Sequence, residues 1–187
     1  MSHWKIMKEK ETELYFLTAT IIEWTPIFTS PKYSDIIIQS LKYCQRAKEL
    51  RIAGYVIMPN HIHMIVAGTL VHPLSDTMRD FKQFTARKII SKLKDDRRIN
   101  ELMIFQKAAM GNERGNTHKV WIEGNHPILV EEGFMFKEKL IYIHNNPVRA
   151  KIVQHPENYL YSSARNYAGL ESMLEIEMLT TTWKTTS

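Results

Sequence analysis

The sequence lacks the features that mark several common classes of protein. Its 187 residues include a single cysteine, Cys44, so no disulfide can form within the chain, which agrees with a reducing compartment. No run approaches the roughly 18 apolar residues of a membrane span, and the N-terminal residues contain no apolar core of signal-peptide length. No internal repeat, linker or second domain is recognisable. We therefore expect a cytoplasmic protein without membrane contact, folded as a single domain over residues 1–187.

The distribution of charge is the first feature that indicates a kind of partner. The formal net charge is +5, and eight basic and three acidic residues between Arg79 and Arg98 together carry the same net charge. A solvated helix face and a surface that follows a phosphate backbone explain such a stretch about equally well. Phe81 and Phe84 lie among the basic residues, and we expect them to pack in the core rather than against bases. The candidate nucleic-acid contacts here are Arg79, Lys82, Arg87 and Lys88.

Periodicity, helix caps and turn residues divide the chain into strands and helices. The order β-α-β-β-α-β, followed by one more helix, predicts an α+β fold of the ferredoxin-like type, an antiparallel sheet with helices on one face plus an added C-terminal helix. Residues 95–117 are polar and show little periodicity, which favours a loop. Residues 170–187 form a tail whose structure the pattern leaves open. The elements are strands at 14–22, 54–58, 61–66 and 119–122, and helices from Pro31 to about Leu50, from Ser75-Asp76, and from Glu131-Glu132 to Pro147.

Two histidines share one face of the predicted strand at 61–66. Residues two apart on a strand point the same way and lie about 6.5–7 Å apart, so His61 and His63 can converge on one metal ion. The aliphatic residues between and after them would face the helices. The pair directly follows the predicted turn at Pro59-Asn60. A pair of this kind also arises by chance, so by itself it supports a metal site and a structural role about equally.

The last predicted helix places a tyrosine outside its apolar stripe. Tyr142 shares a more polar side of this helix with Asn146, four residues later. Because Asn146 precedes Pro147, and residues before proline avoid the α region, Asn145 stays open as the alternative amide. Considered alone, Tyr142 is better explained as an ordinary aromatic residue on the surface of an amphipathic helix.

Four ordered motifs stand out along the chain: Pro59-Asn-His-Ile-His63, Trp121 with His126-Pro127, Tyr142-Ile-His-Asn-Asn-Pro-Val-Arg149 and Tyr159-Leu-Tyr-Ser-Ser-Ala-Arg-Asn-Tyr167. Together they resemble the motifs of the REP-associated tyrosine transposases, which are the single-tyrosine branch of the HUH endonuclease superfamily and are of the insertion-sequence 200-like type. The resemblance covers about residues 12–169. By matching position, it implies Tyr142 as the nucleophile and His61, His63 and Asn146 as metal ligands. Better-known relatives have glutamine where this chain has Asn146, which carries the same amide oxygen on a shorter arm.

The resemblance implies a metal-dependent endonuclease and strand transferase, a transposase that acts on single-stranded hairpin DNA through a covalent 5′-phosphotyrosine. It implies Mg²⁺ or Mn²⁺ as cofactor, with Mn²⁺ the more tolerant of imidazole ligands, and a monomer or homodimer. We expect Arg149 and Arg165 to contact the DNA as well. Two alternatives stay open: a catalytically inactive module that binds single-stranded nucleic acid, and a metal-dependent phosphoesterase in which Tyr142 is structural.

Overall fold

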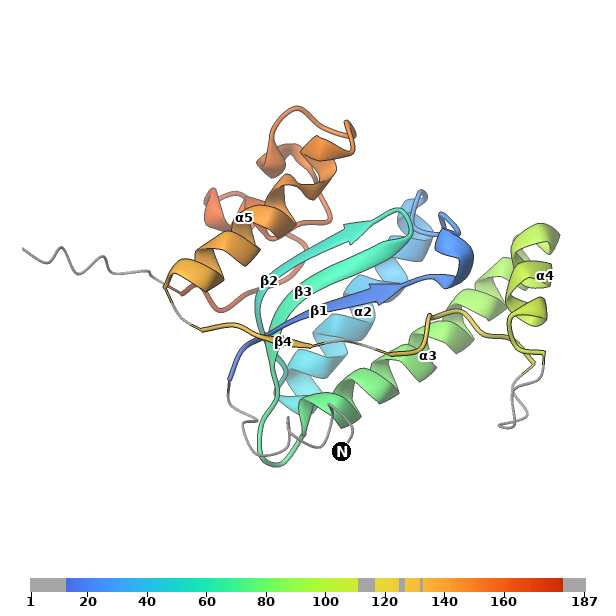
Figure 1. Ribbon diagram of the computed structural model, residues 1–187. Helices are drawn as coiled ribbons and strands as arrows, with labels where there is room; N and C mark the ends of the chain where they lie inside the picture. Colours follow the sequence, from blue (N-terminus) through green and yellow to red (C-terminus); the bar gives the residue numbers. More distant parts are fainter. Residues whose placement is uncertain (1–12, 111–116, 125–126, 132, 180–187) are drawn as a thin grey trace, which may run out of the picture.

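A four-stranded antiparallel sheet organises the chain. The computed structural model describes residues 13–110, 117–124, 127–131 and 133–179 (Figure 1). The sheet has the strand order β2-β3-β1-β4, and each neighbouring pair is antiparallel. This confirms the predicted α+β fold with a ferredoxin-like antiparallel sheet. The strands are β1 (Tyr15–Thr20), β2 (Arg51–Met58), β3 (His61–Ala67) and β4 (Ile128–Leu129).

Helices cover both faces of this sheet. On one face lie α2 (Pro31–Lys48) and α3 (Leu74–Asp95), and on the other lies α5 (Phe134–Arg149) (Figure 1). The larger core forms under α2 and α3, whereas a smaller one forms under α5. The predicted pair of helices on one face and added helix beyond them are therefore confirmed. Shorter elements are η1 (Ile22–Trp24), α4 (Ile99–Lys107), η2 (Pro156–Asn158) and α6 (Ala164–Tyr167).

Strand alternation sorts the side chains between the two cores. Ile62, Met64 and Val66 of β3 belong to the core beneath α2 and α3, as predicted from their spacing. The intervening His63 and Ile65 face α5. A histidine pair on this strand therefore lies on the side of the sheet that carries the last helix.

Two predicted segments differ from the structure. Residues 95–117 were expected to form a loop, but they contain α4, which buries Phe105 completely and carries an ion pair between Arg98 and Glu101. The last strand was expected at 119–122, but the edge strand β4 lies at 128–129. Trp121 makes only an isolated bridge to Ile21 beyond the end of β1.

The last helix was also bounded wrongly. It begins at Phe134, after Glu131, and continues through Pro147 to Arg149. Pro147 lacks the N–H that would donate to the carbonyl of Ile143. Because this proline lies in the last turn of α5, only one hydrogen bond within the helix is lost. The end of the helix is closed by the N–H of Ile152, which donates to the carbonyl of Pro147 over 2.9 Å. Glu132 and His126 lie outside the described residues.

The C-terminal segment protects the outer edge of β2. Tyr161 accepts a hydrogen bond from Ile57 N–H, and Ser163 N–H donates to the carbonyl of Tyr55, both over 2.9 Å. Farther on, Leu174 is buried and Arg51 forms an ion pair with Glu177. These contacts place the first part of the tail, which the sequence pattern left open. None of the helices among the described residues has the length and apolar character needed to cross a membrane.

Candidate active site

The two predicted histidines lie against each other at the start of β3. Their ring centroids are 4.6 Å apart at an angle of 72°. Each is held through Nδ1: His63 pairs with the Thr18 hydroxyl over 2.8 Å, and His61 with the Asn60 side-chain oxygen over 2.7 Å. Among the described residues, neither Nε2 atom has a hydrogen-bond partner. Outer hydrogen bonds of this kind orient histidine ligands of metal ions, since they fix the ring and leave the second nitrogen free.

Burial keeps both imidazoles neutral. It lowers the pKa of His61 below its ordinary value and, with the nearby His61 as a second cause, lowers the pKa of His63 to about 3. A neutral imidazole is the form that binds a metal ion. The pair is therefore ready to act as two nitrogen ligands at neutral pH.

Tyr142 reaches this pair from α5 on the same side of the sheet. Its ring centroid is 5.3 Å from that of His63, and the two rings meet edge to face. Phe16 of β1 stacks on His63 at 5.3 Å and also meets the Tyr142 ring edge-on at 6.1 Å. Tyr142 is 39% exposed, so part of this residue can be reached from solvent. The structure thus brings together the predicted nucleophile and the predicted histidine ligands.

The predicted amide ligand is turned toward its own helix. Asn146 donates through Nδ2 to the carbonyl of Tyr142 over 3.2 Å, and Asn145 does the same to Ile141 over 3.0 Å. Among the described residues, the side-chain oxygen of Asn146 accepts no hydrogen bond. Asn146 is therefore placed beside Tyr142, but the structure does not bring its amide into contact with the histidines.

Two cations flank the aromatic groups of the site. The guanidinium carbon of Arg149 lies 5.6 Å from the centre of the Tyr142 ring. Lys139 Nζ lies 5.6 Å from the centre of the Phe16 ring. Positive charge beside these rings would attract and stabilise a bound phosphate.

The first half of the chain matches a known protein family. The model of the family described as "Transposase IS200 like" matches residues 15–110, just over half of the chain. The chain belongs to the IS200-like transposases. This match includes His61 and His63 but ends before α5, so the role of Tyr142 stays a prediction.

One solved structure supports the assignment of the fold. This IS200-like transposase is similar to a REP-associated tyrosine transposase bound to a REP hairpin, with a TM-score of 0.61 and 15% identity over 95% of this chain and 94% of that one. It also matches a candidate transposase from Deinococcus radiodurans R1, with a TM-score of 0.43 and 18% identity over 78% of this chain and 89% of that one. No curated protein matches the transposase sequence significantly.

The predicted DNA contacts of the transposase lie mostly on α3, across the sheet from Tyr142 (Figure 1). Arg87 and Lys88 are exposed, and Lys88 Nζ lies 5.5 Å from the ring of Phe84. Burial lowers the pKa of Lys82 to about 8. Phe81 is buried as expected, whereas Phe84 is 45% exposed, so the expectation that it belongs to the core is wrong. It lies one residue before Thr85 of the buried stripe, on the exposed side of α3 that also carries Lys88 four residues later.

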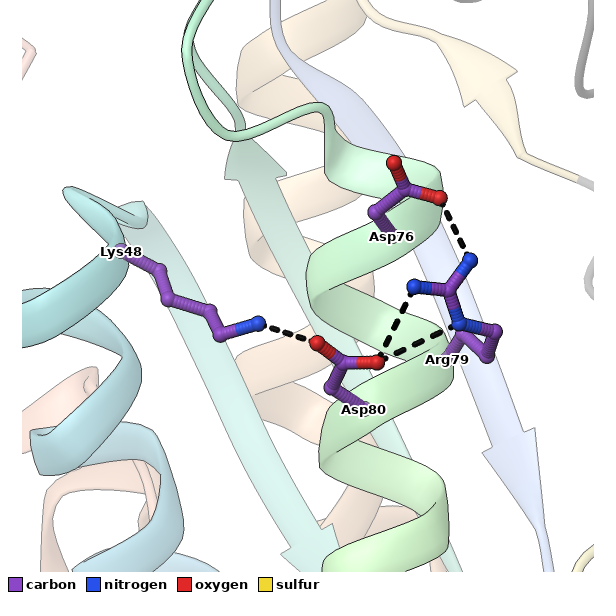
Figure 2. Close-up of polar contacts among 4 residues, drawn as sticks. All are labelled: Lys48, Asp76, Arg79 and Asp80. Carbon is purple, nitrogen blue, oxygen red and sulfur yellow. Dashed lines mark hydrogen bonds and ion pairs between the residues drawn. The ribbon is translucent and has the colours of Figure 1, made fainter.

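Two predicted DNA contacts are already engaged within the protein. Figure 2 shows Arg79 between Asp76 and Asp80, with Lys48 of α2 pairing with the same Asp80. Arg165 donates to the backbone carbonyls of Glu171 and Glu157 over 2.7 and 3.0 Å. Both remain predicted contacts, but DNA would have to compete with these partners.

Proposed function

We propose that this transposase cuts and rejoins single-stranded hairpin DNA through a covalent 5′-phosphotyrosine at Tyr142, with Mg²⁺ or Mn²⁺ as cofactor. The observation that carries the proposal is the 5.3 Å contact between the rings of Tyr142 and His63. It joins β3 and α5, two elements distant in the sequence, on one side of the sheet. A merely structural tyrosine would not need a buried and a half-buried histidine beside it, both neutral and both with Nε2 free of partners among the described residues.

The residues present fit a divalent ion. His61 and His63 would supply Nε2, and Asn146 would supply its amide oxygen, a mixed nitrogen and oxygen set that suits Mn²⁺ and leaves positions open for a phosphate. Bound there, the ion would offset the negative charge of the phosphodiester and orient it. Thr18 and Asn60 hold the two rings through Nδ1, so the ligands are prepared before any ion arrives.

Tyr142 and Arg149 have different roles in the proposed reaction. The Tyr142 oxygen attacks phosphorus, the bond from phosphorus to the 3′-oxygen breaks, and the phenol proton is lost as the departing 3′-oxygen gains one. The new phosphotyrosine ester keeps the energy of the broken bond, so a 3′-hydroxyl can later reverse the step without ATP. Arg149, beside the Tyr142 ring, would stabilise the negative charge of the phosphate during the step.

The proposed substrate rests on charge and on the fold. The chain has a formal net charge of +5, with exposed Arg87 and Lys88 on α3. Basic surfaces follow single-stranded backbones irrespective of base sequence. The similar solved structure is that of a transposase bound to a REP hairpin. A single strand that leaves a hairpin stem would supply both a shape to recognise and a flexible backbone to cut.

Incubation with a hairpin oligonucleotide and Mn²⁺, followed by a denaturing gel, tests the proposal. We expect a covalent protein–DNA adduct that is lost in Tyr142→Phe and retained in Tyr43→Phe, a matched change of an exposed tyrosine on α2. Cleavage that survives Tyr142→Phe would instead support a phosphoesterase. Binding without cleavage would support a catalytically inactive binding module.

A further inference from the structure

Trp24 is a large exposed aromatic side chain at the edge of the candidate active site. It is 58% exposed, and its ring meets the His61 ring edge-on at 5.7 Å. Trp121 shows how the same residue type is used for stability: it is 6% exposed, and its indole N–H donates to Thr85. The indole N–H of Trp24 has no partner among the described residues. Because most of the Trp24 ring is exposed, this side chain adds little to the packing of the core.

The backbone holds Trp24 in this position at a cost. Glu23 and Trp24 both have left-handed conformations, with φ of 51° and 53°, which residues with a Cβ rarely adopt. Two such residues in succession persist only where surrounding contacts impose them, and such sites often serve a ligand. Here the contacts are present: Trp24 N–H donates to Ile21 over 3.0 Å, and its carbonyl accepts from Asn60 Nδ2 over 3.2 Å.

One amide links this turn to the candidate metal site. Asn60 donates to the Trp24 carbonyl through Nδ2 and bonds to His61 Nδ1 through its oxygen. The turn after β1 therefore lies beside the turn between β2 and β3 (Figure 1). The position of the indole is therefore tied to that of the histidine.

We propose that Trp24 is a stacking platform for a base of the single-stranded DNA next to the scissile phosphate. This inference rests on the proposed function, because it needs a phosphodiester at His61 and His63. A strand whose phosphate lies at the histidines must pass its neighbouring bases over the adjoining surface, and the exposed indole is the aromatic face there. Every base has a π face, so the platform would bind bases with little sequence preference.

Equilibrium binding to a fluorescent hairpin with a single-stranded flank tests the inference. The full chain with Tyr142→Phe serves as parent, so that no cleavage occurs during the measurement. Trp24→Asn removes the ring, and asparagine tolerates the left-handed conformation better than most residues do. We expect about tenfold weaker binding for Trp24→Asn and a smaller loss for Trp24→Phe, which retains a stacking ring. Tyr43→Ala, at an exposed aromatic residue on α2, should bind like the parent.

Two further readouts separate stacking from loss of charge or of local structure. The slope of log affinity against log salt should be unchanged by Trp24→Asn, whereas Lys88→Ala should reduce it by about one. Abasic sites are introduced into the single-stranded flank, one position at a time. The parent protein should bind the oligonucleotide more weakly when the base is missing at one particular position. At that position the abasic change should have no further effect on Trp24→Asn.

The outcomes distinguish this inference from the function on which it rests. Parent protein that binds the hairpin, with Trp24→Asn within twofold of it, would overturn the stacking role and leave the proposed function intact. A tenfold loss of affinity without any coupled position in the base scan would also overturn it. The substitution would then act by disturbing the neighbouring His61 rather than by removing a stacked base. Parent protein that binds no single-stranded DNA would overturn both.

Discussion

The hydrogen bond between Thr18 and His63 offers a sharp test of the proposed metal site. Thr18→Val replaces the hydroxyl with a methyl group of nearly the same size and removes the 2.8 Å bond to His63 Nδ1. Phe16 would still stack on His63, so the ring should stay in place while it loses the partner that selects its tautomer. Changes to such outer partners typically weaken metal binding about 10- to 100-fold, which is about 1.4–2.7 kcal/mol.

Thr20→Val provides the matched control for this prediction. Thr20 lies on the same face of β1 and is paired with His61 in the sheet register, but its hydroxyl has no hydrogen bond to either histidine. The assay is the Mn²⁺ concentration that gives half-maximal adduct formation, with Mn²⁺ binding measured by calorimetry on the same proteins. We expect the concentration to rise at least tenfold for Thr18→Val and less than twofold for Thr20→Val. Equal shifts in the two variants would refute the reasoning.

Three further predictions concern stability and reactivity. Gly68→Ala should destabilise the fold by about 1–3 kcal/mol in urea denaturation, because a Cβ there would lie 2.5 Å from the backbone nitrogen of Leu74; an unchanged midpoint would contradict this. Cys44 should resist iodoacetamide in the native protein at about pH 8 and react fully in urea, since burial raises its pKa to about 11; rapid native labelling would count against the burial. Burial lowers the pKa of His144 to about 4, below the ordinary value of 6.5, so the unfolded chain binds more protons between these values and stability falls as pH drops through this range. We expect His144→Gln to reduce the loss of unfolding free energy between about pH 7 and pH 5 by roughly 2 kcal/mol, and an equal loss in both proteins would argue against this.

The sheet was predictable because its strands carry strong alternation. β1 and β3 place apolar residues toward α2 and α3 at every second position, and Pro59-Asn60 marks the turn before β3. The predictions of secondary structure were wrong at α4 and β4, where the local sequence carries little periodic pattern. α4 has a single fully buried side chain, Phe105, which leaves almost no periodic signal. β4 has only two residues, so its pairing with β1 depends on the tertiary fold rather than on local propensity.

The candidate site was only partly accessible from the sequence. His61, His63 and Tyr142 stand in motifs that can be read directly, and the structure brings them together. Thr18 could not be assigned to His63 without the register between β1 and β3, because a shift by one residue would turn its side chain to the other face. Trp24 gave no signal either, since its turn contains no glycine to mark a left-handed conformation.

The position of Tyr142 depends on how closely α5 approaches β2. A Cβ at Gly54 would lie 2.8 Å from Leu140 Cδ1, so the absence of a side chain there lets the helix settle on the strand. One turn later, His144 Nε2 bonds to the hydroxyl of Ser163 over 2.8 Å, and that hydroxyl accepts from the N–H of Tyr55 in β2 over 2.9 Å. Tyr142 lies between these two contacts, and it is thereby fixed against His63 although its own side chain is partly exposed. Because placement errors of about 1 Å can cost orders of magnitude in rate, the proposed chemistry depends on these contacts as much as the packing of α5 on the sheet does.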